Sequence, residues 1–265
     1  MRSRVARTSS FMYAPQPALC RQINGTYMKC NVCATRGGSE YDIAFRNVIT
    51  MKITTAIFDF GYVLSLPPQP SDYHRLAALA GIDGRLFEEI YWGKRTDYDR
   101  GTIDGPVYWR RIAKAAGKEL TPAQIDSLIA HDIAVWMRAN PVMMEWVRAL
   151  KSGGLMIAVL SNMPIEISTY MRQHAPWFRD FDYVCFSAEV QLAKPDAAIY
   201  HACLKVVHSK PEECLFIDDR TENVEAARAL GMYALTFVSV HELATDVKPF
   251  NLPAPLAAGG PDMPV

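Results

Sequence analysis

Four short polar segments along this chain carry side chains of the kind that handle phosphate. In chain order they are Asp59, Ser161-Asn162, Lys194 and Asp218-Asp219. A carboxylate such as Asp59 can attack phosphorus and form an aspartyl-phosphate, which divides one difficult displacement into two easier ones. Two anions then approach each other, so a cation and hydrogen-bond donors are required. Lys194 supplies the charge, while the Ser161 hydroxyl and the Asn162 main-chain N–H supply donors.

Asp218 and Asp219 are adjacent acids, which repel one another unless a cation or donors compensate. Mg²⁺ prefers oxygen ligands and retains several waters, so a few carboxylates are enough to bind it. We therefore expect Mg²⁺ as the cofactor. Each segment taken alone could also have a purely structural role, as a turn, a helix cap or the solvated start of a helix. The four segments together favour a reactive site.

The elements that position these residues are short apolar runs alternating with helical patterns. The predicted strands are Ile53–Phe58, Leu155–Leu160, Tyr183–Phe186, Cys214–Ile217 and Tyr233–Val238. The predicted helices between them are Val142–Ser152, Ile165–His174, Ala197–Val207 and Glu222–Leu230. This alternation predicts an α/β fold, a doubly wound parallel sheet whose ligands bind beyond the carboxyl ends of the strands. The polar segments fall at those ends.

The segment 67–140 has no convincing buried strand and several helical patterns, so we expect a small all-helical cap inserted after the first strand. The helices predicted in it are Tyr73–Ala80, Leu86–Trp92, Tyr108–Ala116 and Pro122–Met137. Residues 51–66 and 141–248 then form the core. Residues 249–265, rich in proline, alanine and glycine, are expected to be a flexible tail.

In this order, and with a helical insertion after the first, the four segments resemble the motifs of the haloacid dehalogenase-like superfamily, in its branch with a helical cap. The resemblance covers about residues 53–240 and includes Tyr98-Asp99-Arg100-Gly101 in the cap. It implies a Rossmann-like core and a phosphatase with Asp59 as nucleophile. It also implies that Mg²⁺ is bound by Asp59, the main-chain carbonyl of Gly61 and Asp219, with Asp218 as a ligand or a partner of the ligands.

Gly61 departs from the pattern of most phosphatases in this superfamily, which have a second aspartate there as general acid and base. Such a group contributes about 10²–10⁴ in rate. Phosphatases that act on glucose 1-phosphate tolerate glycine at this position, so a small sugar phosphate is the expected substrate. Two alternatives remain: a metal-free 2-haloacid dehalogenase, and a weakly catalytic domain that binds a phosphorylated ligand or a protein. Specificity is expected from the cap, where the candidates are Trp92, Arg95, Tyr98, Tyr108 and Trp109, although aromatic residues at helical spacing more often form cap core.

The composition of the chain bears on its binding partners and its location in the cell. Twenty-eight Lys and Arg balance 28 Asp and Glu, so no basic field favours nucleic acid or an anionic membrane. Without an apolar run long enough to span a bilayer, a soluble cytoplasmic protein is expected, as a monomer or homodimer acting on a small phosphorylated metabolite. Residues 1–50 are arginine-rich and acid-poor, and are interpreted as a disordered or non-native extension, with a targeting segment as the alternative. Cys30 and Cys33 lie there, and the spacing of the six cysteines predicts free thiols.

Overall fold

The structure is a computed structural model that describes residues 52–255, and a five-stranded sheet lies at the core of this part. All strands are parallel, in the order β3-β2-β1-β4-β5. Their bounds are β1 Thr55–Phe58, β2 Met156–Ser161, β3 Tyr183–Phe186, β4 Cys214–Asp218 and β5 Tyr233–Thr236. Strands buried on both faces read as continuous apolar runs, which is why the sequence predicted all five within two residues. The predicted α/β class is confirmed.

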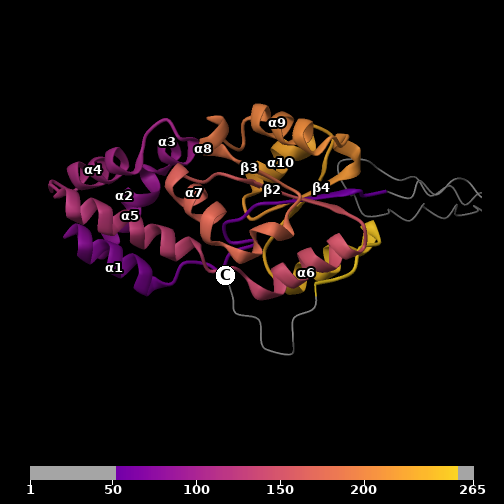
Figure 1. Cartoon of the computed structure of the whole chain (residues 1–265), viewed down its shortest axis with the longest axis horizontal. Coiled ribbons are helices and arrows are strands. Elements are labelled where there is room, and N and C mark those ends of the chain that lie inside the picture. The colour runs from indigo at the N-terminus through magenta and orange to yellow at the C-terminus, as the bar shows by residue number, and fades with distance from the viewer. Residues whose placement is uncertain (1–51, 256–265) are drawn as a thin grey trace, which may run out of the picture. The chain divides into compact units, whose positions relative to one another are not determined.

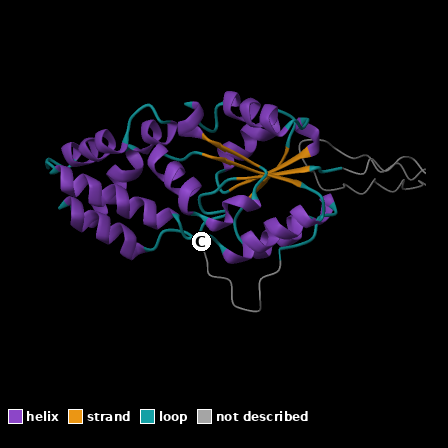
Figure 2. Cartoon of the chain, viewed as in Figure 1, coloured by secondary structure: helices purple, strands orange, loops and turns teal. Residues whose placement is uncertain are grey.

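Helices cover both faces of the sheet (Figures 1 and 2). On one face lie α6 (Pro141–Ser152), α7 (Ile165–His174) and α11 (Val240–Asp246), and on the other α9 (Ala197–Val207) and α10 (Thr221–Ala229). Successive side chains of β1 point to opposite faces of the sheet. Phe58 therefore packs in the apolar cluster under α6, α7 and α11, and Ile57 packs in the cluster under α9 and α10. Each such fully buried side chain stabilises the fold by about 1.5–3 kcal/mol. The central strand is thereby fixed from both sides.

A separate helical group is inserted after β1 and appears at the left of Figure 1. Its helices are α1 Pro70–Ala80, α2 Gly84–Gly93, α3 Arg95–Arg100, α4 Gly105–Ala115 and α5 Pro122–Trp136. Side-chain caps begin three of them: Asp83 accepts from the Arg85 N–H, Asp104 accepts from the Val107 N–H, and Thr121 forms a capping box with Gln124. The group has an apolar core of its own, in which Trp109 is fully buried.

The chain enters and leaves this helical group through two paired connections. Ser65 and Ala139 form an isolated antiparallel bridge. The Leu66 N–H donates to the Arg138 carbonyl, and the Asn140 N–H donates to the Leu64 carbonyl, both at 2.8 Å. The two crossings therefore lie together, directly after the strand that ends at Asp59.

Several short elements were not predicted, because a few turns of polar sequence have no clear period. These are α3, α8 (Ser187–Val190), α11, η1 (Pro176–Asp180), η2 (Pro211–Glu213) and η3 (Lys248–Phe250). Residues 249–255, the described part of the expected loose tail, pack on the core. Phe250 is only 5% exposed, and the Trp146 indole N–H donates to the Pro253 carbonyl at 2.6 Å. A buried aromatic side chain and a part-buried hydrogen bond to α6 hold these residues.

The predictions for the cysteines and for the two ends of the chain concern residues that the structure describes only in part. Cys185, Cys203 and Cys214 are free and buried, as predicted. The extension 1–50 with its cysteine pair, and the last ten residues of the expected tail, lie outside the described residues. Between residues 52 and 255, none of the helices combines the length and apolar character needed to cross a membrane.

Candidate active site

The parallel sheet brings the predicted site residues to one edge. Asp59 directly follows the central strand β1, whose last residue Phe58 pairs with Val159 on one side and Ile217 on the other. The predicted residues on β2 and β4 therefore flank Asp59: Ser161 ends β2, and Asp218 ends β4 with Asp219 next. A cavity at this edge is lined by six of the seven predicted residues: Asp59, Gly61, Ser161, Asn162, Lys194 and Asp219.

Lys194 is the cation at the centre of the site. Its ammonium group lies 3.0 Å from Oδ1 of Asp59 and 2.6 Å from Oδ2 of Asp218, and it donates to the Leu160 carbonyl at 2.8 Å. The side chain is 1% exposed. Burial by itself lowers the pKa of this ammonium group, but the ion pairs with Asp218 and Asp59 raise the pKa overall. Lys194 therefore stays charged.

Asp218 is the seventh predicted residue, and it lies behind the cavity wall rather than in it. It is fully buried, and Asn223 in the first turn of α10 donates to both of its carboxylate oxygens, at 2.9 and 3.1 Å. The Arg220 main-chain N–H donates to Oδ1 at 2.9 Å. Asp218 is thus held in one orientation against Lys194. The sequence analysis missed Asn223, although an amide side chain in the first turn after an acid pair was the available clue.

Asp59, Asp218 and Asp219 offer ligand atoms that all lie within 4.8 Å of one another. The pKa of the Asp219 carboxyl is raised to about 7, chiefly by burial and also by the negative charges of Asp59 and Asp218. The pKa of Asp59 is also raised, chiefly by burial and against the opposing effect of Lys194. One ammonium group thus faces three carboxyls. This oxygen-rich cluster with surplus negative charge fits a Mg²⁺ ion.

Asn162 has a role that its residue type alone did not indicate. Its side-chain amide donates to the Lys194 carbonyl at 2.9 Å, and its side-chain oxygen accepts from the Lys194 N–H at 2.8 Å. This paired contact fixes the Lys194 loop against the end of β2. The Ser161 hydroxyl forms a hydrogen bond with the Asp59 carboxyl group, and this bond lowers the pKa of Asp59. Helix α7 begins at Ile165, just after these residues.

The cap closes the other side of the cavity. Trp92, Arg95, Asp99 and Trp136 line it from the helical insertion. Two of the five predicted specificity residues, Trp92 and Arg95, therefore reach the cavity. The other three belong to the interior of the helical group: Tyr98, Tyr108 and Trp109. The cavity itself is small, about 100 Å³.

Arg95 is buried within the cap although it carries a charge. It is 6% exposed and pairs with Asp99 at 2.7 Å and Asp132 at 3.1 Å. The Tyr91 hydroxyl donates to Asp132 at 2.6 Å and accepts from Arg95. The guanidinium also lies 5.1 Å from the centre of the Tyr91 ring. Burying this cation costs desolvation free energy. The carboxylates of Asp99 and Asp132 and the surrounding aromatic ring offset that cost.

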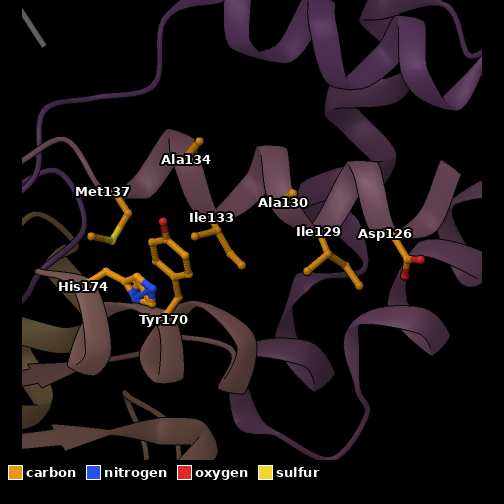
Figure 3. A pocket seen from close by; sticks show the side chains of 8 residues that line it. All are labelled: Asp126, Ile129, Ala130, Ile133, Ala134, Met137, Tyr170 and His174. Carbon is orange, nitrogen blue, oxygen red and sulfur yellow. The ribbon is translucent and has the colours of Figure 1, made fainter. Parts of the chain in front are cut away.

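A second hollow lies between α5 and α7, where side chains of the two helices face each other (Figure 3). Tyr170 and His174 from α7 stack on each other, with ring centres 4.1 Å apart. The remaining lining residues come from α5, and most are apolar: Asp126, Ile129, Ala130, Ile133, Ala134 and Met137. None of the seven predicted site residues lines this hollow.

Comparisons with known proteins agree with this geometry. A family model for haloacid dehalogenase-like hydrolases matches residues 50–231. Sesquiterpene phosphatase astK of Aspergillus oryzae is 34% identical, over 68% of this chain and 87% of that protein. Bifunctional epoxide hydrolase 2 of Mus musculus is 24% identical over 75% of this chain. The match covers only 38% of the length of that protein.

Among solved structures, an HAD family enzyme, bt-2542 from Bacteroides thetaiotaomicron, was determined as a mutant in complex with magnesium and inorganic phosphate. It matches with a TM-score of 0.56 and 20% identity, over 69% of this chain and 93% of that chain. This likeness concerns the fold. The family model covers more than half of the chain, and its range includes all seven predicted site residues. The chain belongs to the haloacid dehalogenase-like hydrolases.

Proposed function

We propose that this protein is a Mg²⁺-dependent phosphatase that cleaves phosphate monoesters through an aspartyl-phosphate on Asp59. One observation carries the proposal: the carboxylates of Asp59, Asp218 and Asp219 converge at the carboxyl edge of the sheet, with Lys194 bonded to two of them. A phosphoryl group carries negative charge on several oxygens, so its transfer needs concentrated positive charge and donors. The name of the Aspergillus relative, a sesquiterpene phosphatase, agrees with this chemistry.

The roles follow from the contacts. Asp59 lines the cavity and attacks phosphorus, while Lys194, the Ser161 hydroxyl and the Asn162 main-chain N–H bind the phosphate oxygens. Asp218 is already engaged by Lys194 and Asn223, so we assign it to orienting Lys194. Mg²⁺, when bound, would orient the phosphoryl group and offset its charge. Its ligands would be Asp59, the Gly61 carbonyl and Asp219.

The substrate is a small phosphate ester, and two classes of leaving group are candidates. A sugar phosphate agrees with Gly61, because an anomeric phosphate leaves readily and demands less of an acid. An apolar alcohol is the second candidate, favoured by the aromatic and aliphatic wall. Trp92 and Trp136 lie edge to face there, with ring centres 6.2 Å apart, and Met163 and Ile167 line the same cavity. The Aspergillus relative is named for such a substrate class.

A panel of phosphate esters tests the proposal. Sugar phosphates, an isoprenoid monophosphate and 4-nitrophenyl phosphate are each assayed with Mg²⁺ and with chelator. Phosphate release should require Mg²⁺ and should disappear in Asp59→Asn. Asp246→Asn is the matched control, because Asp246 is an exposed carboxylate at the end of α11. Trapping of radioactive phosphate on the wild-type protein but not on Asp59→Asn supports the covalent intermediate.

The alternatives predict other outcomes of the same panel. A dehalogenase would release chloride from 2-chloropropionate in the presence of chelator and leave every phosphate ester intact. A binding domain would retain a phosphorylated ligand equally well in the wild-type protein and in Asp59→Asn, with no phosphate released. Either pattern would refute the phosphatase proposal.

A further inference from the structure

Gly61 leaves this site without a carboxylate two residues after the nucleophile. The cap packs beside it, because a Cβ added at position 61 would make ordinary van der Waals contact with the Trp136 ring, at 3.5 Å. A phosphatase of this design still has to protonate the departing oxygen of any alcohol that is a poor leaving group. If the proposed function holds, another residue must provide that proton.

The geometry of the reaction indicates where the acid must lie. Attack on phosphorus is in line, so the departing oxygen lies opposite Asp59, on the side of the cavity that the cap closes. The carboxyl groups that line the cavity are those of Asp59, Asp219 and Asp99. The first two belong to the sheet edge, and Asp99 belongs to α3 of the cap. Asp99 is therefore the carboxyl on the leaving-group side.

Asp99 is held in a way that leaves one oxygen available. Arg95 Nε donates to Oδ1 of Asp99 at 2.7 Å, and Arg95 is itself fixed by Asp132. The ion pair uses Oδ1, so Oδ2 is the oxygen that can carry a proton, and the residue lines the cavity. A rotamer fixed by a buried guanidinium is the kind of support that a proton donor needs, because transfer requires hydrogen-bond distance in the reactive complex.

Helix α3 is also docked on the core, so that Asp99 has a defined position relative to Asp59. The Ser187 hydroxyl at the start of α8 donates to the Asp99 main-chain carbonyl. Next to it, Gly101 packs so closely on Ala188 that an added Cβ would lie 2.7 Å from the Ala188 backbone. Arg100 pairs with Asp196 across the same junction, at 2.9 Å. Three contacts thus fix the segment that carries Asp99.

The charged groups around Asp99 tune its proton affinity. The pKa of its carboxyl is raised to about 6, chiefly by burial, with smaller contributions from the charges of Asp132 on α5 and Asp59 after β1. Arg95 on α3 opposes this rise. A general acid works best with a pKa near the operating pH. Tyr62, a titratable group that also lines the cavity, fits the role less well, because burial raises its pKa above 10.0.

We propose that Asp99 is the general acid and base of this site, replacing the carboxylate that Gly61 lacks. The inference rests on the proposed function. In the first step Asp59 bonds to phosphorus, the ester P–O bond breaks, and the Asp99 proton passes to the departing oxygen. In the second step the Asp99 carboxylate takes a proton from water as that water attacks the aspartyl-phosphate. Inorganic phosphate leaves, Asp59 is restored, and Asp99 again carries its proton.

The test compares a poor leaving group with a good one. Asp99→Asn is assayed with an alkyl phosphate and with 4-nitrophenyl phosphate, both with Mg²⁺. We expect kcat/KM on the alkyl phosphate to fall about 10²–10⁴-fold, with a much smaller loss of kcat/KM on 4-nitrophenyl phosphate, whose phenolate leaves without a proton. The comparison uses kcat/KM because kcat also includes hydrolysis of the aspartyl-phosphate, which Asp99 assists as a base for both esters. The ratio of the two rates does not depend on the fraction of protein that is folded. Asp97→Asn on the same helix is the control, because Asp97 is exposed and pairs with Arg111.

Two further variants keep the test decisive. Asp99→Glu retains a carboxyl and should recover most of the loss on the alkyl ester. Gly61→Asp, added to Asp99→Asn, should restore part of the rate, since the 3.5 Å contact with Trp136 is ordinary van der Waals contact. Equal losses of kcat/KM on both esters, or none, would overturn the assignment of Asp99 while leaving the phosphatase intact. A wild-type protein inactive on every ester would overturn both proposals.

Discussion

Replacing Lys194 with methionine should destabilise the protein in addition to impairing catalysis. The ammonium group has three partners at 2.6, 2.8 and 3.0 Å: Asp218, the Leu160 carbonyl and Asp59. Methionine has a similar length but no charge. Asp218 would then keep its negative charge in a fully buried position, with Asn223 and a main-chain N–H as donors. Electrostatics, rather than lost volume, should dominate the effect.

The size of the effect can be estimated from the burial of the pair. Removing one partner of a buried ion pair costs about 3–5 kcal/mol, because it leaves an uncompensated charge. For a domain of about this size, each kcal/mol lowers the melting temperature by roughly 2–4 °C. Lys194→Met should therefore melt roughly 6–20 °C below the wild-type protein.

The pH dependence gives a second readout. Without the ammonium group, the folded-state pKa of Asp59, which is already raised and which Lys194 lowers, should rise further. An acid with a raised folded-state pKa loses stability as the pH rises, so the destabilisation should be largest near pH 8 and should shrink toward about pH 5. Thermal and urea unfolding in chelator, at several pH values, measure this. Lys205→Met on the exposed face of α9 is the control.

Two results would refute this reasoning. A melting temperature within about 1 °C of the wild-type value would mean that the three contacts do not stabilise the fold. A destabilisation that is equal at low and high pH would mean that lost packing, not unpaired charge, is the cause.

Three further predictions concern the surroundings of the site. Asn162→Ala removes two hydrogen bonds to the loop that carries the catalytic lysine and should cost about 1–3 kcal/mol in urea unfolding; an unchanged midpoint would contradict it. Gly101→Ala should destabilise more than Gly81→Ala, because both glycines have positive φ (75° and 65°) but only Gly101 faces a backbone within 2.7 Å; equal melting shifts would refute the close contact. In chelator, the raised pKa of Asp219, about 7, means that wild-type stability should fall as the pH rises from about 4 to about 7, and less so in Asp219→Asn; equal slopes would exclude Asp219 as the cause.

The local sequence was sufficient for the core elements and for the identity of the reactive groups. Continuous apolar runs that alternate with helical patterns are typical of strands buried on both faces of a parallel sheet, so β1 to β5 and the helices between them could be placed within a few residues. The ends of such strands meet at one edge of a sheet. This is why Asp59, Ser161 and Asp218 could be grouped before any coordinates were known.

Pairings between distant segments depended on the tertiary structure. The sequence places Asn162 beside Ser161, but only the fold brings its side chain to the backbone of Lys194, 32 residues away. Asn223 likewise becomes a partner of Asp218 only because α10 begins where β4 ends. Hydrogen bonds of this kind leave no periodic trace in a sequence.

The same limit explains why the cap was only partly understood. Helix α3 is six residues long and mostly polar, so no hydrophobic period indicated it. Arg95 was predicted only as a specificity candidate, and Asp99 was noted only as part of a segment that the family resemblance includes. Tertiary packing instead buries Arg95 among aromatic rings and directs Asp99 toward the cavity.

The proposed nucleophile, the lysine, the acid pair and the glycine at position 61 could therefore be selected from the sequence alone, because each lies at the end of a strand or in the loop beside it. Which group lies across the cavity from Asp59 was decided by the tertiary structure. That group comes from a helix some 40 residues further along the chain, and its burial depends on contacts between the cap and the core.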